Sequence, residues 1–115
     1  MKLNDIIIVG YPASGKTYLA RIFETVYGYK TIEIGDLVRQ ESSEQGLNSY
    51  DCVSNYFDKK DYCHFVSIAL KKKMNDTNNH YVYVGVRRVE ELYYLLQHLA
   101  NPVTIGMIAD YDTRN

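Results

Sequence analysis

Residues 10–17 read Gly-Tyr-Pro-Ala-Ser-Gly-Lys-Thr, and this stretch decides the fold of the 115-residue chain. It fits the pattern of Gly, four residues, Gly, Lys and then Thr or Ser. Just before it, residues 4–9 form a short run, Asn-Asp-Ile-Ile-Ile-Val, that is mostly β-branched and ends at the first glycine. After it, apolar residues recur at helical spacing as far as Gly28, namely Leu19, Ile22, Phe23 and Val26. The motif therefore lies between a strand and a helix, which is the context that its phosphate-binding interpretation requires.

The residue types of this motif suit a phosphate-binding loop, or P-loop. Glycines let the loop curl so that backbone N–H groups point at an anion, and the following helix adds the positive end of its dipole. We expect Lys16 to reach the β- and γ-phosphates of a nucleotide and the Thr17 hydroxyl to ligate Mg²⁺. A merely flexible Gly/Ser loop is the alternative, which the flanking strand and helix disfavour. The residues predicted to bind ATP or another NTP are Gly10, Pro12, Ala13, Ser14, Gly15, Lys16 and Thr17.

Composition and charge restrict the classes of protein to consider. A chain of 115 residues has room for one domain with one core. Its net charge of −1 argues against a protein that mainly coats nucleic acid or an anionic membrane. No apolar run approaches the roughly 20 residues that span a bilayer, and the N-terminal residues run directly into a predicted strand, so no signal peptide is expected. We therefore expect a cytoplasmic protein, and in it Cys52 and Cys63, which lack metal-ligand spacing, should be reduced.

Strand and helix patterns alternate along the rest of the chain. Strands are predicted at residues 5–9, 31–34, 80–84 and 103–108. Two helices are predicted by their range, at residues 16–27 and 89–99. Four more are predicted to begin at the N-cap residues Asp36, Ser49, Asp58 and Asp110. This alternation favours an α/β fold with a parallel sheet and right-handed crossovers.

Two further segments narrow the prediction: IEIGDLVRQE at residues 32–41 and YVYVGVRRVEEL at residues 81–92. With the P-loop before them, they make the chain resemble the P-loop nucleoside monophosphate kinases from residue 6 to residue 114. It looks most similar to the adenylate kinase-like and dephospho-CoA kinase-like proteins. The resemblance implies a three-layer P-loop NTPase fold, with a short parallel sheet flanked by helices, in one domain over residues 1–115.

The resemblance also assigns acceptor-site residues. In that family a Gly-Asp pair after the second strand opens the acceptor-site helix, and an arginine one turn later binds the acceptor phosphate; Gly35, Asp36 and Arg39 match. A second acceptor arginine follows the third strand, and Arg87 matches it. Two guanidiniums would hold one phosphate bidentately, which Lys does less well; ordinary surface charge is the alternative for both. Arg114 resembles the first lid arginine, which reaches the donor phosphates.

The chain departs from the family in two ways. The family usually places an Asp at the end of the third strand, where it holds Mg²⁺ through water, and this chain has Val84. Asp36, Glu90 or Glu91 are the carboxylates that could replace it. The resemblance also implies a lid, a fifth strand and a base-binding loop after Arg114, so we expect either a truncated chain, a split or degenerate gene product, or a minimal relative without them. The strand at residues 103–108 would then expose an apolar edge, so we expect either a homo-oligomer formed through that edge or a marginally stable, weakly active chain.

The remaining aromatic and titratable residues carry weaker predictions. On the third strand Tyr81 and Tyr83 share one face, and core packing is favoured over stacking on a base. His64, His80 and His98 lack carboxylate partners at a recognisable spacing, so no acid–base role is predicted for them.

Three functional hypotheses follow. The first is an ATP-dependent phosphotransferase that moves the γ-phosphate to a nucleoside monophosphate-like acceptor. Here Lys16 and Mg²⁺ neutralise the donor phosphates while Arg39 and Arg87 hold the acceptor. The second is a kinase of a hydroxyl, of the dephospho-CoA type, with Asp36 as the base. The third is a non-catalytic NTP-binding regulatory module, which Val84 and the short chain favour. The expected partners are a nucleotide donor and a small phosphate-bearing acceptor.

Overall fold

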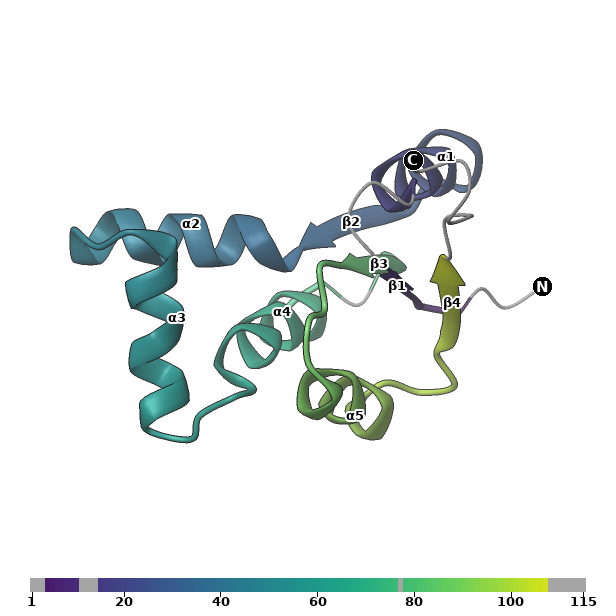
Figure 1. The fold of residues 1–115 in the computed structure, drawn as a ribbon. Helices are drawn as coiled ribbons and strands as arrows, with labels where there is room; N and C mark the ends of the chain where they lie inside the picture. The colour runs from purple at the N-terminus through teal and green to yellow at the C-terminus, as the bar shows by residue number, and fades with distance from the viewer. Residues whose placement is uncertain (1–3, 11–14, 77, 108–115) are drawn as a thin grey trace, which may run out of the picture.

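Four parallel strands form the centre of the protein in the computed structural model, which describes residues 4–10, 15–76 and 78–107 (Figure 1). The strands are β1 (Ile6–Gly10), β2 (Lys30–Glu33), β3 (Tyr81–Val84) and β4 (Val103–Met107), in the order β2-β3-β1-β4. All pairs are parallel, so the carboxyl ends of the strands meet at one edge of the sheet. The predicted α/β fold is confirmed, and β1 is an interior strand with β3 on one side and β4 on the other.

Alternation along the interior strands divides the core into two halves. Ile7, Tyr81 and Tyr83 belong to one half, and Ile6, Ile8, Val82 and Val84 to the other. Because both faces of β1 and β3 are covered, these strands are apolar throughout. The Tyr83 side chain is completely buried, which confirms that the β3 tyrosines pack in the core.

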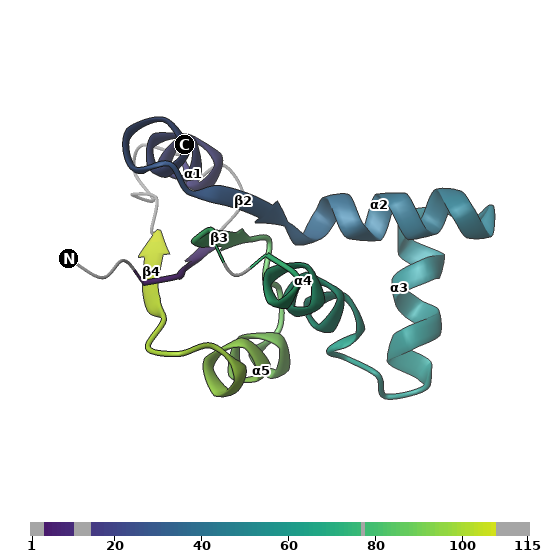
Figure 2. The same ribbon diagram turned by 180° about the vertical axis from the view of Figure 1, so that it is seen from behind.

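The helices cover the two faces of the sheet unequally. Helix α1 (Lys16–Tyr27) lies on one side, whereas α4 (His64–Met74) and α5 (Val89–His98) lie on the other, which makes three layers (Figure 1 and Figure 2). Helices α2 (Ile34–Gln45) and α3 (Ser49–Asp58) project beyond the β2 edge of the sheet (Figure 1).

Three predicted helix caps are wrong. Strand β2 passes directly into α2, and the cap is Glu33, whose carboxylate accepts a hydrogen bond from the Gly35 N–H at 3.3 Å; Asp36 is already inside the first turn. Helix α3 is capped by Asn48, whose Oδ1 accepts from the backbone of Asp51 at 2.8 Å, and Ser49 is its first residue.

The third wrong cap, Asp58, is the last residue of α3. Lys60, with φ of 59°, reverses the chain there. The backbone N–H groups of Lys60 and Asp61 then donate to the last carbonyls of α3, on Phe57 and Tyr56, at 2.9 and 2.8 Å. A helix end closed in this way cannot also start the next helix, so α4 begins six residues later, at His64.

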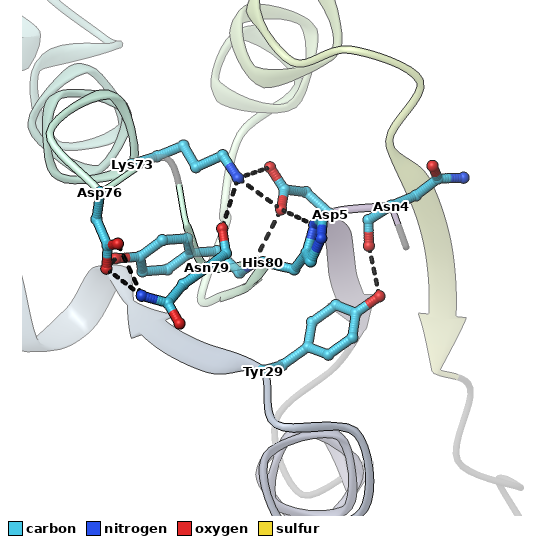
Figure 3. Close-up of polar contacts among 8 residues, drawn as sticks. Asn4, Asp5, Tyr29, Lys73, Asp76, Asn79 and His80 are labelled. Carbon is cyan, nitrogen blue, oxygen red and sulfur yellow. Dashed lines mark hydrogen bonds and ion pairs between the residues drawn. The ribbon is translucent and has the colours of Figure 1, made fainter. Parts of the chain in front are cut away.

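A polar network ties the elements together at the amino edge of the sheet (Figure 3). The buried Asp5 carboxylate accepts from the Tyr81 N–H at 2.9 Å and from the Lys73 ammonium at 3.2 Å. Asp76 accepts from the Tyr81 hydroxyl at 2.7 Å and pairs with Lys30 at 3.0 Å. The network joins α4 to β1, β2 and β3.

Within the described residues, none of the helices is long and apolar enough to cross a membrane.

Candidate nucleotide-binding site

A cavity of about 760 Å³ opens at the carboxyl edge of the sheet, where β1, β2 and β3 end. Ligand sites of open parallel sheets lie at this edge, because loops diverge there and helix N-termini point at it. The residues that line the cavity are Val9, Gly10, Lys16, Thr17, Glu33, Val84, Gly85, Val86, Arg87, Arg88, Val89 and Leu92.

The P-loop contributes the residues that end β1 and begin α1. Gly15 precedes the helix with φ of 91°, in the left-handed region that favours glycine. It has no side chain that could cap the helix, so the first N–H groups of α1 are available to an anion. Lys16 and Thr17 follow and line the cavity, and the Lys16 ammonium donates to the Gly10 carbonyl at 2.6 Å. The predicted contacts of Pro12, Ala13, Ser14 and Arg114, and the cap Asp110, lie outside the described residues.

Glu33 is a lining residue that the sequence did not single out. It is the last residue of β2, and its register partner on β3 is Val84, the position where the resembling family has its Asp. Gly85 follows with φ of +94°, and a β-carbon there would lie 2.5 Å from the Glu33 Oε1. The Glu33 carboxylate therefore fills the space beside Gly85.

Arg87 lines the cavity on a segment that Glu91 holds in place. One oxygen of the Glu91 carboxylate accepts from the backbone N–H groups of both Arg87 and Arg88, each at 3.1 Å. Glu91 is buried, which raises the pKa of its carboxyl group, while the two N–H groups act to lower it. The neighbouring Arg88 packs its guanidinium on aromatic rings, 4.6 Å from the ring centres of both Phe57 and Tyr62.

Asp36 and Arg39 pair with each other on the exposed face of α2, as their three-residue spacing predicts. Neither is among the described residues that line the cavity. Arg39 nevertheless approaches its rim, because a β-carbon at Gly35 would lie 3.3 Å from both the Arg39 Nη1 and the Glu33 Oε1. The two predicted acceptor arginines thus lie on the wall and at the rim of one cavity.

The carboxylates considered as replacements for the missing Asp are engaged elsewhere. Asp36 pairs with Arg39, Glu90 pairs with Arg88 at 3.2 Å, and Glu91 holds the start of α5. Among the described lining residues, Glu33 is the one with an acidic side chain.

The sequence also missed a histidine–carboxylate pair. His64 Nε2 lies 2.9 Å from the Glu41 carboxylate, although 23 residues separate them in the chain. The His64 ring stacks on Tyr56 at 3.8 Å between centroids. Burial acts to raise the pKa of Glu41, but hydrogen bonds from Tyr56 and His64 outweigh it and lower that pKa. This cluster joins α2, α3 and α4 and includes Cys52, which is a free, buried thiol.

The residues of the cavity suit Mg²⁺ bound together with a nucleotide. In the described ranges there is no group of three or more His, Cys, Asp or Glu side chains that could hold a metal alone. Mg²⁺ needs no such group, since it prefers hard oxygen ligands and keeps waters and substrate phosphates in its shell. The Thr17 hydroxyl and the Glu33 carboxylate supply oxygens of this kind on either side of Val84.

Comparisons with known proteins identify the family of this chain. A family model described as an AAA domain matches residues 9–106. A UPF0200 protein of Methanosarcina barkeri is 34% identical over 95 residues, which cover 78% of this chain and 50% of that protein. A UPF0200 protein of Methanococcus maripaludis is 32% identical over 105 residues, covering 85% and 56%.

A third relative, a UPF0200 protein of Pyrobaculum aerophilum, is 44% identical over 45 residues, covering 39% of this chain and 25% of that protein. The chain therefore spans about half the length of the first two relatives and a quarter of the third. The family model covers most of the chain, P-loop included, and the chain belongs to this family of P-loop, kinase-like AAA domains.

Proposed function

We propose that the protein is an ATP-dependent phosphotransferase that moves the γ-phosphate to a small phosphate-bearing acceptor such as a nucleoside monophosphate. One observation carries the proposal: a single cavity joins the P-loop residues Lys16 and Thr17 to Arg87. A donor phosphate at the P-loop and an acceptor phosphate at Arg87 would therefore share one space. Phosphoryl transfer needs little beyond positioning and charge neutralisation in such a space.

The donor side is proposed to work as follows. The first N–H groups of α1 bind the phosphates, and Lys16 leaves the Gly10 carbonyl to pair with the β- and γ-phosphates. The Thr17 hydroxyl would hold Mg²⁺, which supplies charge neutralisation between the β- and γ-phosphates when it is bound.

The acceptor side rests on Arg87 and Arg39. The Glu91 carboxylate fixes the backbone that carries Arg87, and Arg39 reaches the rim of the cavity beside Gly35. In this proposal Arg39 exchanges its partner Asp36 for the acceptor phosphate. A bidentate fork explains the use of arginine at both positions.

Calorimetry tests the donor site. Lys16→Ala should weaken ATP binding by about 1.5–3 kcal/mol, or roughly ten- to a hundredfold, because it removes a charge-assisted contact. Lys72→Ala, a change at an exposed lysine of α4, is the matched control and should leave the affinity unchanged. Equal ATP affinities of wild type and Lys16→Ala would rule out nucleotide binding at the P-loop.

Turnover assays test the acceptor site. Wild type is incubated with ATP and a panel of nucleoside monophosphates, with dephospho-CoA as a hydroxyl acceptor. Arg39→Lys and Arg87→Lys should each reduce transfer to a monophosphate while leaving ATP affinity nearly unchanged, because Lys cannot form the fork. Preferred transfer to dephospho-CoA would contradict a phosphate acceptor.

The second candidate is a non-catalytic NTP-binding module, favoured by Val84, which stands where the resembling family has its Asp. It predicts tight nucleotide binding without turnover on any acceptor. A hydroxyl kinase with Asp36 as its base is disfavoured, since Asp36 is not among the described residues that line the cavity.

A further inference from the structure

We propose that Glu33 replaces the missing β3 carboxylate and anchors the nucleotide-bound Mg²⁺ through a water molecule. The inference rests on the proposed nucleotide binding at the P-loop and assigns a role to a residue outside the P-loop motif. It departs from the resembling family, in which this carboxylate lies on β3.

The position of Glu33 suits the substitution. Its register partner is Val84, so the two residues are neighbours at the same edge of the sheet. Adjacent strands lie about 4.8 Å apart. A carboxylate on β2 therefore starts one strand further from the P-loop than one on β3 would, and Glu has one more methylene than Asp to extend its reach. Glu33 and Thr17 both line the same cavity, so the two residues border one space.

A built recess holds the carboxylate there. At Gly85 a β-carbon would come within 2.5 Å of the Glu33 Oε1 and 3.3 Å of the Ile34 nitrogen. The same oxygen accepts from the Gly35 N–H at 3.3 Å. Among the described hydrogen bonds none uses the second oxygen, Oε2, which is the one assigned to the metal-bound water.

Capping of α2 does not by itself account for a glutamate. Ser, Thr, Asp and Asn are the preferred N-cap residues, and they do this work with a shorter side chain. A full negative charge in a cavity that binds phosphates would repel the ligand unless a cation lies between them. A metal-bound water removes this conflict, because the carboxylate then stabilises the cation and the cation stabilises the phosphates.

The experiment compares ATP binding by calorimetry with Mg²⁺ and with EDTA, in wild type and Glu33→Gln. Gln keeps an oxygen that can cap α2, so the change removes the charge and spares the helix. Outer-shell carboxylates typically contribute 10- to 100-fold to metal affinity. The expected result is a 10- to 100-fold loss of the Mg²⁺-dependent gain in ATP affinity, with the affinity in EDTA unchanged or tighter. Electron paramagnetic resonance of Mn²⁺ bound with ADP should show the same loss of metal affinity.

Glu90→Gln is the matched control, because it removes a carboxylate from an exposed residue beside the cavity. It should keep the Mg²⁺-dependence of wild type, and thermal unfolding should show that Glu33→Gln is folded. Equal Mg²⁺-dependence in wild type and Glu33→Gln would overturn this inference alone, as would an equal loss of affinity with and without the metal. Wild type that binds no nucleotide under either condition would overturn the proposed function and this inference together.

Discussion

Replacing Gly85 with alanine tests the packing that the site depends on. The residue has φ of +94°, where an L side chain costs about 1–2 kcal/mol. The new methyl group would also lie 2.5 Å from the Glu33 Oε1, so the carboxylate has to move. Moving it breaks the N-cap bond to Gly35, which is worth about 0.5–2 kcal/mol. We expect Gly85→Ala to lower the free energy of unfolding by about 2–4 kcal/mol.

Two comparisons separate these contributions in urea denaturation. Gly28→Ala is the matched control, because Gly28 has φ of +73° and a β-carbon there meets nothing within 4 Å. It should lose only the backbone contribution, about 1–2 kcal/mol. Glu33→Ala removes the clashing carboxylate, so the double variant with Gly85→Ala should be destabilised by less than the sum of the single changes. The shortfall measures the contact between Gly85 and Glu33.

Additivity would refute this reasoning. If the single and double variants add to within about 0.5 kcal/mol, the alanine methyl group and the carboxylate do not compete for one space. A Gly85→Ala protein as stable as Gly28→Ala would show the same. The recess beside Gly85 that holds the Glu33 carboxylate would then not exist. The proposal that Glu33 anchors Mg²⁺ would lose this support.

Three further predictions concern the core, the amino edge and β4. The buried Tyr83 hydroxyl has no hydrogen-bond partner among the described residues, so Tyr83→Phe should raise the free energy of unfolding by about 1 kcal/mol. Tyr81→Phe loses a hydrogen bond to Asp76 and should lower the free energy of unfolding. The opposite order of the two variants in urea denaturation would contradict this prediction. Hydrogen bonds from Tyr81, Lys30 and Asn79 lower the pKa of Asp76 to about 2 from 3.8, so the stabilisation is present above pH 4 and is lost as pH falls towards 2. In a plot of melting temperature against pH, Asp76→Asn should flatten the fall between pH 4 and about 2. A plot that is the same for wild type and Asp76→Asn would contradict this prediction. We also propose that the chain self-associates through β4, which in the described sheet pairs on one side only. Sedimentation should show a dimer, and Val103→Lys should convert it to a monomer. A monomeric wild type would refute the proposal.

Local pattern determined much of the fold. The helix predicted at residues 16–27 has the bounds that the structure gives to α1, because its apolar spacing and Gly28 act within one element. The alternation of β3 separated its tyrosines from its valines correctly for the same reason. The P-loop could be assigned from sequence since strand, loop and helix are contiguous.

The wrong helix caps show where local reasoning failed. Asp36 has the chemistry of an N-cap, but β2 runs without a break into α2, and the Glu33 side chain reaches Gly35 first. Asp58 also has that chemistry, but the left-handed Lys60 closes α3 there. Which of several suitable residues caps a helix depends on how the chain enters the element, and that depends on packing.

The tertiary structure alone decided which distant residues meet at the site. His64 finds Glu41 because α2 and α4 pack together, and Glu33 joins Thr17 and Gly85 because the strand order β2-β3-β1 brings their ends to one edge. A carboxylate at the end of β2 carries no signal that Gly85, just after β3, leaves the space that it occupies. Strand order is a property of the whole core, since it is chosen by the burial of both sheet faces together, and no single stretch of sequence encodes it.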